Sequence, residues 1–377
     1  MYLNKRISVT QKLSTTSKKW VKIAKMIKIL LPILTLLALV SCQDKKETTH
    51  LSVSFENLMG KGYAAWQNVE TEQDFENLRF FKALYDKKHG LLETEQNKER
   101  IPKRIHFIWL GPKDFPRESI PNVRSWIGKH PDWEVFFWTD RNRPLPHPAM
   151  EKKFVKDFTF CFLEKCYARS DNYAEKADLL RYEILLQQGG VYVDHDVKCL
   201  RPFDLFNNTF SLYCGLDLPF PTPLPSSVFA TNSLIGSVPA HPILSACISK
   251  VLERWDKTEE DYAGNNRDAI INRIAHRSFS PFGESVRELA AEDISQDVIV
   301  LPAFYFNAPK ENLSLFAHHQ YKGTWFENET PFEKTTRERL MYISKKTNKI
   351  LLACSIMTAL NLAGFGFLLL YRRKKKY

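Results

Sequence analysis

A stretch in the middle of the chain, residues 174–200, combines a helical pattern, a helix stop, a short apolar run and two aspartates. The apolar residues recur with the period of an amphipathic helix at Leu179, Leu180, Ile184, Leu185 and Leu186. The pair Gly189-Gly190 can adopt the left-handed conformations that end a helix. Residues 191–193 are then predicted to form a buried strand, which brings the chain directly to the aspartates.

Asp194 and Asp196 follow this predicted strand. Residues i and i+2 of an extended segment point the same way, so the two carboxylates should share a face and His195 should take the other. Two oxygen ligands suit Mg²⁺ or Mn²⁺, which keep open positions for a substrate diphosphate. Asp178 and Arg181 lie one helical turn apart, where they can meet the same ligand. A D-x-D triplet alone more often marks a solvated turn, but the coupled pattern favours a site.

The segment 177–197, ADLLRYEILLQQGGVYVDHDV, resembles the core of glycosyltransferase family 32, the "DXD sugar-binding" family. This family includes initiating mannosyltransferases and mannosyl inositol-phosphoceramide synthases. The resemblance implies an α/β fold with a GT-A-type, Rossmann-like nucleotide-sugar-binding domain. It also implies metal-dependent transfer of a hexose from a nucleotide sugar, with retention of anomeric configuration. GDP-mannose is the favoured donor on family membership alone, and the acceptor would be a glycan or a membrane glycolipid.

The resemblance assigns roles to five residues. Asp196 would hold the cation directly, and Asp194 would bind the ribose, the sugar or the metal through water. Asp178 and Arg181 would grip sugar hydroxyls, and Arg181 would also stabilise the departing diphosphate. Trp109 would stack on the nucleotide base, although a tryptophan at a strand end is otherwise more often part of the core. Asp178, Arg181 and Asp194 are therefore the predicted catalytic residues.

Two later segments extend the predicted site. Asn232 begins an N-x-x-I-G pattern and would approach the donor sugar or the acceptor. His319 stands five residues before Thr324, in the family's histidine and Ser-Trp spacing, and would complete the metal shell. It is preferred only slightly over His318. Trp325 would lie near the phosphates. Residues 280–283 depart from the family's T-G-P motif, which leaves the acceptor side open.

The pattern of an α/β domain begins at Ile101. Ile105, Phe107 and Trp109 alternate with other residues as in a first strand, and a helix over 120–130 and a strand over 133–138 follow. Strand, helix and strand predict the start of a doubly wound sheet, which binds ligands beyond the carboxyl ends of its strands. No glycine-rich phosphate loop accompanies this pattern, so a metal must offset the diphosphate charge.

The net charge of +11 comes from the two ends of the chain. Residues 1–28 contain eight lysines and arginines and no acid, and residues 372–376 are all cationic, which leaves a net charge of −2 elsewhere. This distribution excludes the even basicity of a nucleic-acid-binding protein and indicates membrane flanks. We therefore expect a lipid bilayer, and no nucleic acid, among the partners.

The sequence predicts seven regions. A basic segment (1–28) precedes a hydrophobic signal or anchor segment (29–42) whose end resembles a bacterial lipobox at Cys42. A stem (43–100), a catalytic domain (101–330) and a juxtamembrane linker (331–349) follow. The uncharged run 350–371 is long enough to form a transmembrane helix, and a basic tail (372–377) ends the chain. The side of the membrane that holds the catalytic domain stays open.

Two other functions remain compatible with the sequence. A metal-dependent phosphoesterase would also use clustered carboxylates, although two-metal sites usually need more acidic and histidine ligands than this core provides. A non-catalytic sugar-binding envelope protein would keep the fold without turnover. The joint presence of Trp109, Asp178, Arg181, Asp194 and Asp196 argues against the second. Five cysteines outside the terminal segments permit disulfides and require none.

Overall fold

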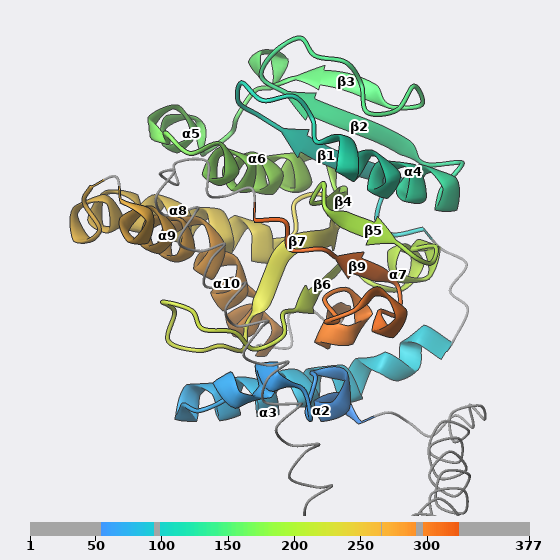
Figure 1. Cartoon of the computed structure of the whole chain (residues 1–377), viewed down its shortest axis with the longest axis vertical. Coiled ribbons are helices and arrows are strands. Elements are labelled where there is room, and N and C mark those ends of the chain that lie inside the picture. The colour runs from blue at the N-terminus through green and yellow to red at the C-terminus, as the bar shows by residue number, and fades with distance from the viewer. Residues whose placement is uncertain (1–53, 94–98, 265, 292–296, 324–377) are drawn as a thin grey trace, which may run out of the picture. The chain divides into compact units, whose positions relative to one another are not determined.

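A mixed sheet of seven strands organises the part of the chain that the structure describes (Figure 1). The computed structural model describes residues 54–93, 99–264, 266–291 and 297–323. The strand order is β3-β2-β1-β4-β7-β6-β8. The seven strands are β1 (Arg104–Trp109), β2 (Glu134–Thr139), β3 (Glu151–Phe154), β4 (Gly190–Val193), β6 (Leu212–Leu216), β7 (Ala230–Ser237) and β8 (Val298–Leu301).

The strand directions bring several strand ends to one edge of this sheet. β1 is parallel to β2 and β4, and β2 is parallel to β3. β7 is antiparallel to both β4 and β6, and β6 is parallel to β8. The carboxyl ends of β1, β4 and β6 therefore meet at the same edge, which is where open α/β sheets bind ligands. A separate two-stranded sheet pairs β5 (Val197–Cys199) antiparallel to β9 (Ala317–His319).

Helices surround the sheet, and all described residues from Phe55 onward belong to one compact unit. Helix α6 packs on β1 and β4, α10 packs on β7, and α3 packs on β8. A π-helical segment, Ala275–Phe279, joins α9 to α10. The helices are α2 (Phe55–Leu58), α3 (Glu72–Lys88), α4 (Ile120–Lys129), α5 (Glu164–Arg169), α6 (Tyr173–Gln188), α7 (Asp204–Thr209), α8 (Pro242–Asp261), α9 (Arg267–Ile274) and α10 (Ser280–Ala291).

The elements predicted from local patterns are present. The first strand, the helix over 120–130 and the strand over 133–138 correspond to β1, α4 and β2, each within one residue of the predicted bounds. Helix α6 ends at Gln188, and Gly189 follows it with φ 63° and ψ −161°, a positive-φ conformation that favours glycine but is not the left-handed helical one. A Cβ at Gly190 would lie 2.9 Å from the backbone oxygen of Arg104, so the second glycine permits close packing on β1.

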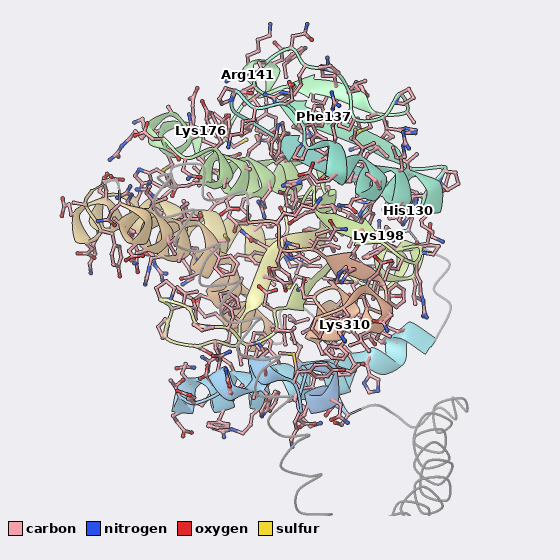
Figure 2. The ribbon with its side chains drawn as sticks, viewed as in Figure 1. His130, Phe137, Arg141, Lys176, Lys198 and Lys310 are labelled. Atoms are coloured by element: carbon pink, nitrogen blue, oxygen red, sulfur yellow. The ribbon has the colours of Figure 1, made fainter. Side chains whose placement is uncertain are left out.

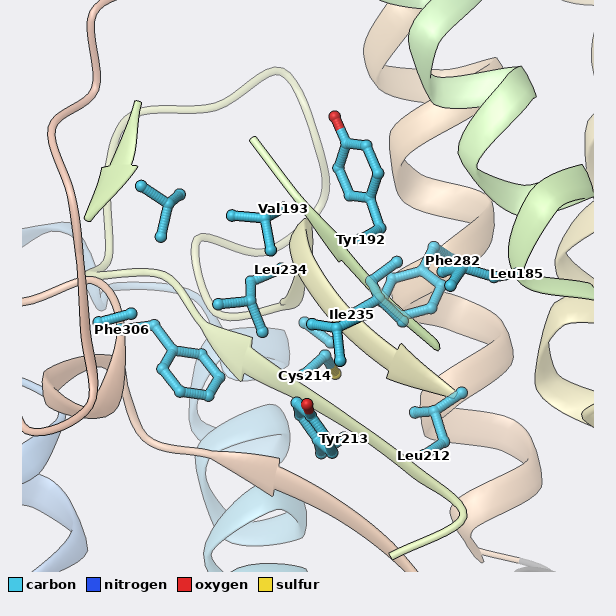
Figure 3. Close-up of a cluster of buried hydrophobic side chains, with 14 of the residues drawn as sticks. Leu185, Tyr192, Val193, Leu212, Tyr213, Cys214, Leu234, Ile235, Phe282 and Phe306 are labelled. Carbon is cyan, nitrogen blue, oxygen red and sulfur yellow. The ribbon is translucent and has the colours of Figure 1, made fainter. Parts of the chain in front are cut away.

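The core lies between the sheet and these helices. Figure 3 shows the fully buried side chains of Leu212, Tyr213 and Ile235, which come from the neighbouring strands β6 and β7. A Cβ at Gly236 would lie 2.2 Å from the ring of Tyr213, so this strand needs a glycine where the tyrosine crosses it. Charged side chains such as Arg141 and Lys310 are exposed, as Figure 2 shows.

The segment 55–93, which lies within the predicted stem, is bound to the domain by buried hydrogen bonds. Asp74 is 1% exposed and caps α3 together with Thr71. Its Oδ1 accepts hydrogen bonds from the Ser226 hydroxyl (2.8 Å) and the Ser227 backbone N–H (2.6 Å). The Asn77 amide donates to the carbonyl of residue 228 at 2.7 Å. These contacts fix the loop that joins β6 to β7 onto α3.

Several predictions concern residues outside the described ranges. The hydrophobic segment 29–42, with Cys42, and the predicted transmembrane helix 350–371 both lie there. Within the described ranges, no helix has the length and apolar character needed to cross a bilayer. The five described cysteines are all free thiols: Cys161, Cys166, Cys199, Cys214 and Cys247.

Asp74→Ala should lower the free energy of unfolding by about 3 kcal/mol at pH 7, because the backbone N–H groups of Glu70, Thr71 and the buried Ser227 lose their carboxylate acceptor. Asp86 is a matched control on the same helix, since its contact with Lys82 is solvent-exposed. Asp86→Ala should change stability by less than about 0.5 kcal/mol. Urea unfolding of both variants and the wild type measures these differences. Equal effects of the two substitutions would contradict the assignment.

The stability difference between the wild type and Asp74→Ala should also depend on pH. Burial alone raises the pKa of Asp74, but the hydrogen bonds from Thr71 and Ser226 outweigh burial and hold that pKa well below its usual range. Because the folded-state pKa is depressed, the stabilisation is complete above the unfolded pKa of about 4 and is lost as the pH falls below it. The stability difference between wild type and Asp74→Ala should therefore shrink between pH 5 and pH 2.5. A constant difference would show that folding does not lower the pKa of Asp74.

Candidate active site

A cavity of about 550 Å³ opens at the sheet edge where β1, β4 and β6 end. The predicted site residues on the described part of the chain all line it: Trp109, Asp178, Arg181, Asp194, Asp196, Asn232 and His319. These residues are separated by up to 210 positions in the sequence, so the fold itself brings them together. Trp325 lies outside the described residues. The roles of these side chains remain predictions.

Helix α6 presents Asp178 and Arg181 to the cavity. The helix begins where the Asn172 side chain accepts hydrogen bonds from the backbone N–H groups of Ala174 and Glu175. This cap and the glycine stop fix both ends of the helix, and therefore which face meets the sheet. Asp178 and Arg181 then form the predicted i, i+3 contact, with 2.7 Å between Arg181 Nη2 and Asp178 Oδ1.

The guanidinium of Arg181 joins three elements of the fold. Its Nη2 lies 3.4 Å from Oδ1 of Asp194, at the end of β4, and its Nη1 donates to the backbone oxygen of Asn232 on β7 at 2.6 Å. The guanidinium also stacks over the ring of Tyr192, 4.0 Å from its centroid. Arg181 is 3% exposed, so these contacts hold a buried cation in one position.

Asp178 is held as firmly as its partner. Its Oδ1 accepts from the Asn232 side-chain amide at 3.2 Å, and its Oδ2 accepts from the Ser278 hydroxyl at 2.7 Å. Burial raises the pKa of Asp178 to about 6, although Arg181 and Ser278 oppose this shift. Asp178 is therefore mainly ionised at pH 7 and pairs with the arginine. A carboxylate and a guanidinium fixed side by side can bind neighbouring hydroxyl groups of a sugar.

The predicted extended path through the two aspartates is wrong in one respect. Strand β4 ends at Val193, and the chain then turns, with the backbone N–H of Val197 donating to the oxygen of Asp194 at 3.1 Å. The turn still brings Asp194 and Asp196 to the same cavity. His195 lines this cavity as well, with its ring edge-on to Trp109 at 4.9 Å, so the predicted separation of His195 from the two aspartates is also wrong.

Asp194, Asp196 and His319 form a group that can hold a metal ion, with ligand atoms within 4.8 Å of one another. The small sheet explains this arrangement, since β9 runs antiparallel to β5 and pairs His319 with Val197. The His318 ring instead contacts the Ser314 hydroxyl at 3.0 Å. These contacts favour His319 over His318 as the ligand.

The chemistry of His319 fits a cation. Its Nε2 lies 3.4 Å from Oδ1 of Asp196, and its Nδ1 is buried without a hydrogen-bond partner among the described residues. Burial raises the pKa of Asp196, but the hydrogen bond to His319 outweighs it and holds that pKa well below the usual range. Burial lowers the pKa of His319, and the contact with Asp196 more than reverses this. Two oxygen donors and one nitrogen donor suit Mn²⁺ or Mg²⁺.

Trp109 forms the wall of the cavity at the end of β1. Its indole N–H donates to the backbone oxygen of Lys113 at 2.9 Å, and its ring packs edge-on against Phe115 and His195. The ring is 8% exposed. Its position is compatible with the predicted base contact, which remains a prediction.

The cavity also contains three residues that the sequence analysis did not identify. Tyr192 donates a hydrogen bond to Oδ1 of Asp194 at 2.5 Å, and its place two residues before Asp194 on a strand could have indicated the shared side. Tyr321 stacks on His319, with 4.0 Å between the ring centroids, and donates to Oδ1 of Asp217 at 2.6 Å. No local pattern indicates Asp217, because β6 reaches the site through long-range pairing.

Comparison with known proteins finds a family model that matches part of this site. Residues 116–212 match the family model described as "Glycosyltransferase sugar-binding region containing DXD motif". The matched range contains Asp178, Arg181, Asp194 and Asp196, and ends before Asn232 and His319.

Several known proteins are similar to parts of the chain. The chain is 29% identical over 242 residues to subversion of eukaryotic traffic protein A of Legionella pneumophila, covering 60% of this chain and 34% of that protein. It is 31% identical over 181 residues to a mannosyl phosphorylinositol ceramide synthase of Saccharomyces cerevisiae, covering 45% of this chain and 41% of that protein. It is 24% identical over 261 residues to an initiation-specific alpha-1,6-mannosyltransferase of Schizosaccharomyces pombe, covering 60% and 64%.

The matched segments thus span less than two thirds of the length of these relatives. Within that span, the family model covers the α6 helix, the glycine stop and the two aspartates, which are the features from which the resemblance was drawn. Residues 116–212 therefore resemble the DXD-containing sugar-binding region of the glycosyltransferases, which agrees with the resemblance predicted from the sequence.

Proposed function

We propose that the protein is a membrane-anchored, metal-dependent glycosyltransferase with a GT-A-type domain, which transfers a hexose from a nucleotide sugar. The observation that supports this most strongly is the buried network of Asp178, Arg181 and Asp194 beside the Asp196–His319 pair, all in one cavity. Mannose is the favoured sugar and GDP-mannose the favoured donor, because two relatives are named for mannosyl transfer. The acceptor would be a glycan or a membrane glycolipid.

The donor would lie along the edge of the sheet. Trp109 at the end of β1 would contact the base, and the group formed by Asp194, Asp196 and His319 would face the diphosphate. The sugar would then lie near Asp178 and Arg181. This order follows the order of the strands, β1 then β4 then β7, so a single extended ligand would touch all of these residues.

Asp194, Asp196 and His319 would hold the divalent cation, Mn²⁺ or Mg²⁺. When bound, such a cation neutralises part of the diphosphate charge and so favours departure of the leaving group. The protein itself would supply the remaining stabilisation of the leaving group. Because Arg181 is fixed by Asp178, Tyr192 and the Asn232 carbonyl, its charge is already oriented before the substrate binds, which lowers the cost of stabilising developing negative charge.

Asp178 would act through position rather than as a base. Its two oxygens are already committed to Arg181, Asn232 and Ser278, so it would align the arginine and accept hydrogen bonds from sugar hydroxyls. Retention of anomeric configuration is proposed from the family resemblance. Membrane anchoring is proposed from segments 29–42 and 350–371, and the orientation of the domain stays open.

Mn²⁺ should bind the wild-type chain and raise its melting temperature, and Asp196→Ala should weaken this binding at least tenfold, because it removes one of three ligands. Asp132 is a suitable control, since its carboxylate is exposed and pairs with Lys103 away from the cavity. Asp132→Ala should keep the wild-type affinity. Titration calorimetry with MnCl₂ in the absence of nucleotide measures the affinities. If Asp196→Ala binds Mn²⁺ as tightly as the control, the assigned ligands are wrong.

GDP-mannose should be hydrolysed slowly by the wild type, faster than UDP-glucose, UDP-galactose or UDP-N-acetylglucosamine, and EDTA should stop the reaction. Arg181→Lys should lower kcat about 10²-fold, because lysine keeps the charge but loses the fork that contacts Asp178 and Asn232 together. Release of the nucleoside diphosphate measures each rate.

The matched control is Arg254→Lys, which changes an arginine paired with Glu284 outside the cavity. Its kcat should stay within twofold of the wild type. If the wild type neither binds nor hydrolyses any of the four donors with Mn²⁺ present, the proposed activity is wrong. If Arg181→Lys retains full kcat, the role given to the arginine is wrong.

A further inference from the structure

The cavity continues beyond the proposed donor position to the end of β6. Along the ligand-binding edge the strands follow the order β1, β4, β7 and β6, and neighbouring strands lie about 4.8 Å apart. A donor with its base at Trp109 and its diphosphate near Asp194 would extend toward β7. Asp217, which follows β6, lines the same cavity. The remaining space is therefore placed for a second substrate.

Asp217 has the properties of a ligand-binding carboxylate. It is 6% exposed, and the Tyr321 hydroxyl, at 2.6 Å from Oδ1, is the hydrogen-bond donor that the described residues provide. An ionised carboxylate can accept about four hydrogen bonds, and burying it is costly when these are not made. Burial accordingly raises the pKa of Asp217. A ligand that brings hydroxyl groups into the cavity would supply the missing donors.

An apolar wall lies beside this carboxylate. Leu218, Pro219 and Phe220 directly follow it and line the cavity, together with Phe279 of the π-helical segment. The Phe220 ring is 38% exposed and meets Phe229 edge-on at 5.5 Å, and Phe229 in turn meets Phe279 at 5.0 Å. A carboxylate next to an exposed aromatic ring suits a ligand with an apolar face and hydroxyls at its edge, which describes a saccharide or a cyclic polyol.

The segment 55–93 holds this apolar wall in place. The Asn68 side chain donates to the backbone oxygen of Pro219 at 3.0 Å, and Asp74 accepts hydrogen bonds from residues 226–227 further along the same loop. Ala65 lines the cavity directly. The loop from Asp217 to β7 is therefore fixed at both ends rather than free, which is the rigidity that a binding site requires.

We propose that Asp217 and the apolar wall of residues 218–220 form the acceptor subsite, which takes a saccharide or polyol whose hydroxyl donates to the Asp217 carboxylate. This inference rests on the proposed transferase function and deepens it. The subsite lies at the end of β6 and adjoins the proposed metal group, because Tyr321 both donates to Asp217 and stacks on His319. Asp217 is an acceptor-binding residue, and Asn68 and Asp74 of the segment 55–93 hold the apolar wall in position.

The test compares transfer with hydrolysis in one reaction. The full chain is incubated with GDP-mannose, Mn²⁺ and one of three probes: methyl α-D-mannopyranoside, lactose or myo-inositol. The ratio of glycosylated probe to free mannose is measured by mass spectrometry. Asp217→Asn should lower this ratio at least tenfold for the probe that the wild type uses best, with the loss mainly in KM for the probe. Losing a hydrogen bond to a charged group has an effect of this size.

Phe220→Ala gives an independent variant, because the ring is partly exposed and its removal should not prevent folding. It should also lower the transfer ratio. Phe162→Ala is the matched control, since this ring is 55% exposed and does not line the cavity. Its ratio should equal that of the wild type. Thermal melting of each variant checks that it is folded.

Three results would overturn the inference. The first is an unchanged ratio in both Asp217→Asn and Phe220→Ala. The second is an equal loss of hydrolysis and transfer, which would assign Asp217 to the donor. The third is a wild type that hydrolyses GDP-mannose but transfers to none of the probes, which would reject the acceptor class and leave the proposed function standing. If no donor is bound or hydrolysed, both the function and the subsite fall together.

Discussion

The site depends on the contacts that the buried guanidinium of Arg181 makes. The guanidinium joins helix α6, strand β4 and strand β7 through Asp178, Asp194 and the Asn232 carbonyl. A buried cation is costly unless its donors are satisfied, so the three elements can pack here only in an arrangement that supplies these acceptors. The same contacts that satisfy the arginine leave it oriented toward the cavity. The contacts that stabilise the packing of these three elements are therefore the same contacts that orient Arg181 in the site.

The parts of the fold that the sequence predicted are those governed by local physics. Helix α6 has a cap at Asn172 and a stop at Gly189, and β1 shows alternation, so each could be recognised from its own residues. The pairing of β7 with β4 and that of β5 with β9 join residues more than 40 positions apart. His319 was located only through a family spacing, and Asp217 was not found, since no neighbouring residue marks its place.

The turn after β4 brings together the predicted site residues although the backbone predicted for residues 194–196 was extended. An extended strand would place Asp194 and Asp196 on one face by simple alternation. The structure instead turns at His195, and the small sheet formed by β5 and β9 then returns His319 to Asp196. Alternation would not have predicted this third side chain at the site. The turn therefore accounts for a three-residue group where a straight strand would offer two carboxylates.

The segment 55–93 bears on where the boundary between the stem and the catalytic domain should be drawn. The sequence predicts that residues 55–93 belong to a stem that packs on the catalytic domain. Asp74 is nearly inaccessible to solvent and Ala65 lines the cavity, so this segment contributes both to stability and to the wall of the site. Since the β6–β7 loop is anchored on α3, a change in α3 would be expected to move that wall more than the residues around Arg181. The proposed donor and acceptor positions thus rest on different parts of the chain.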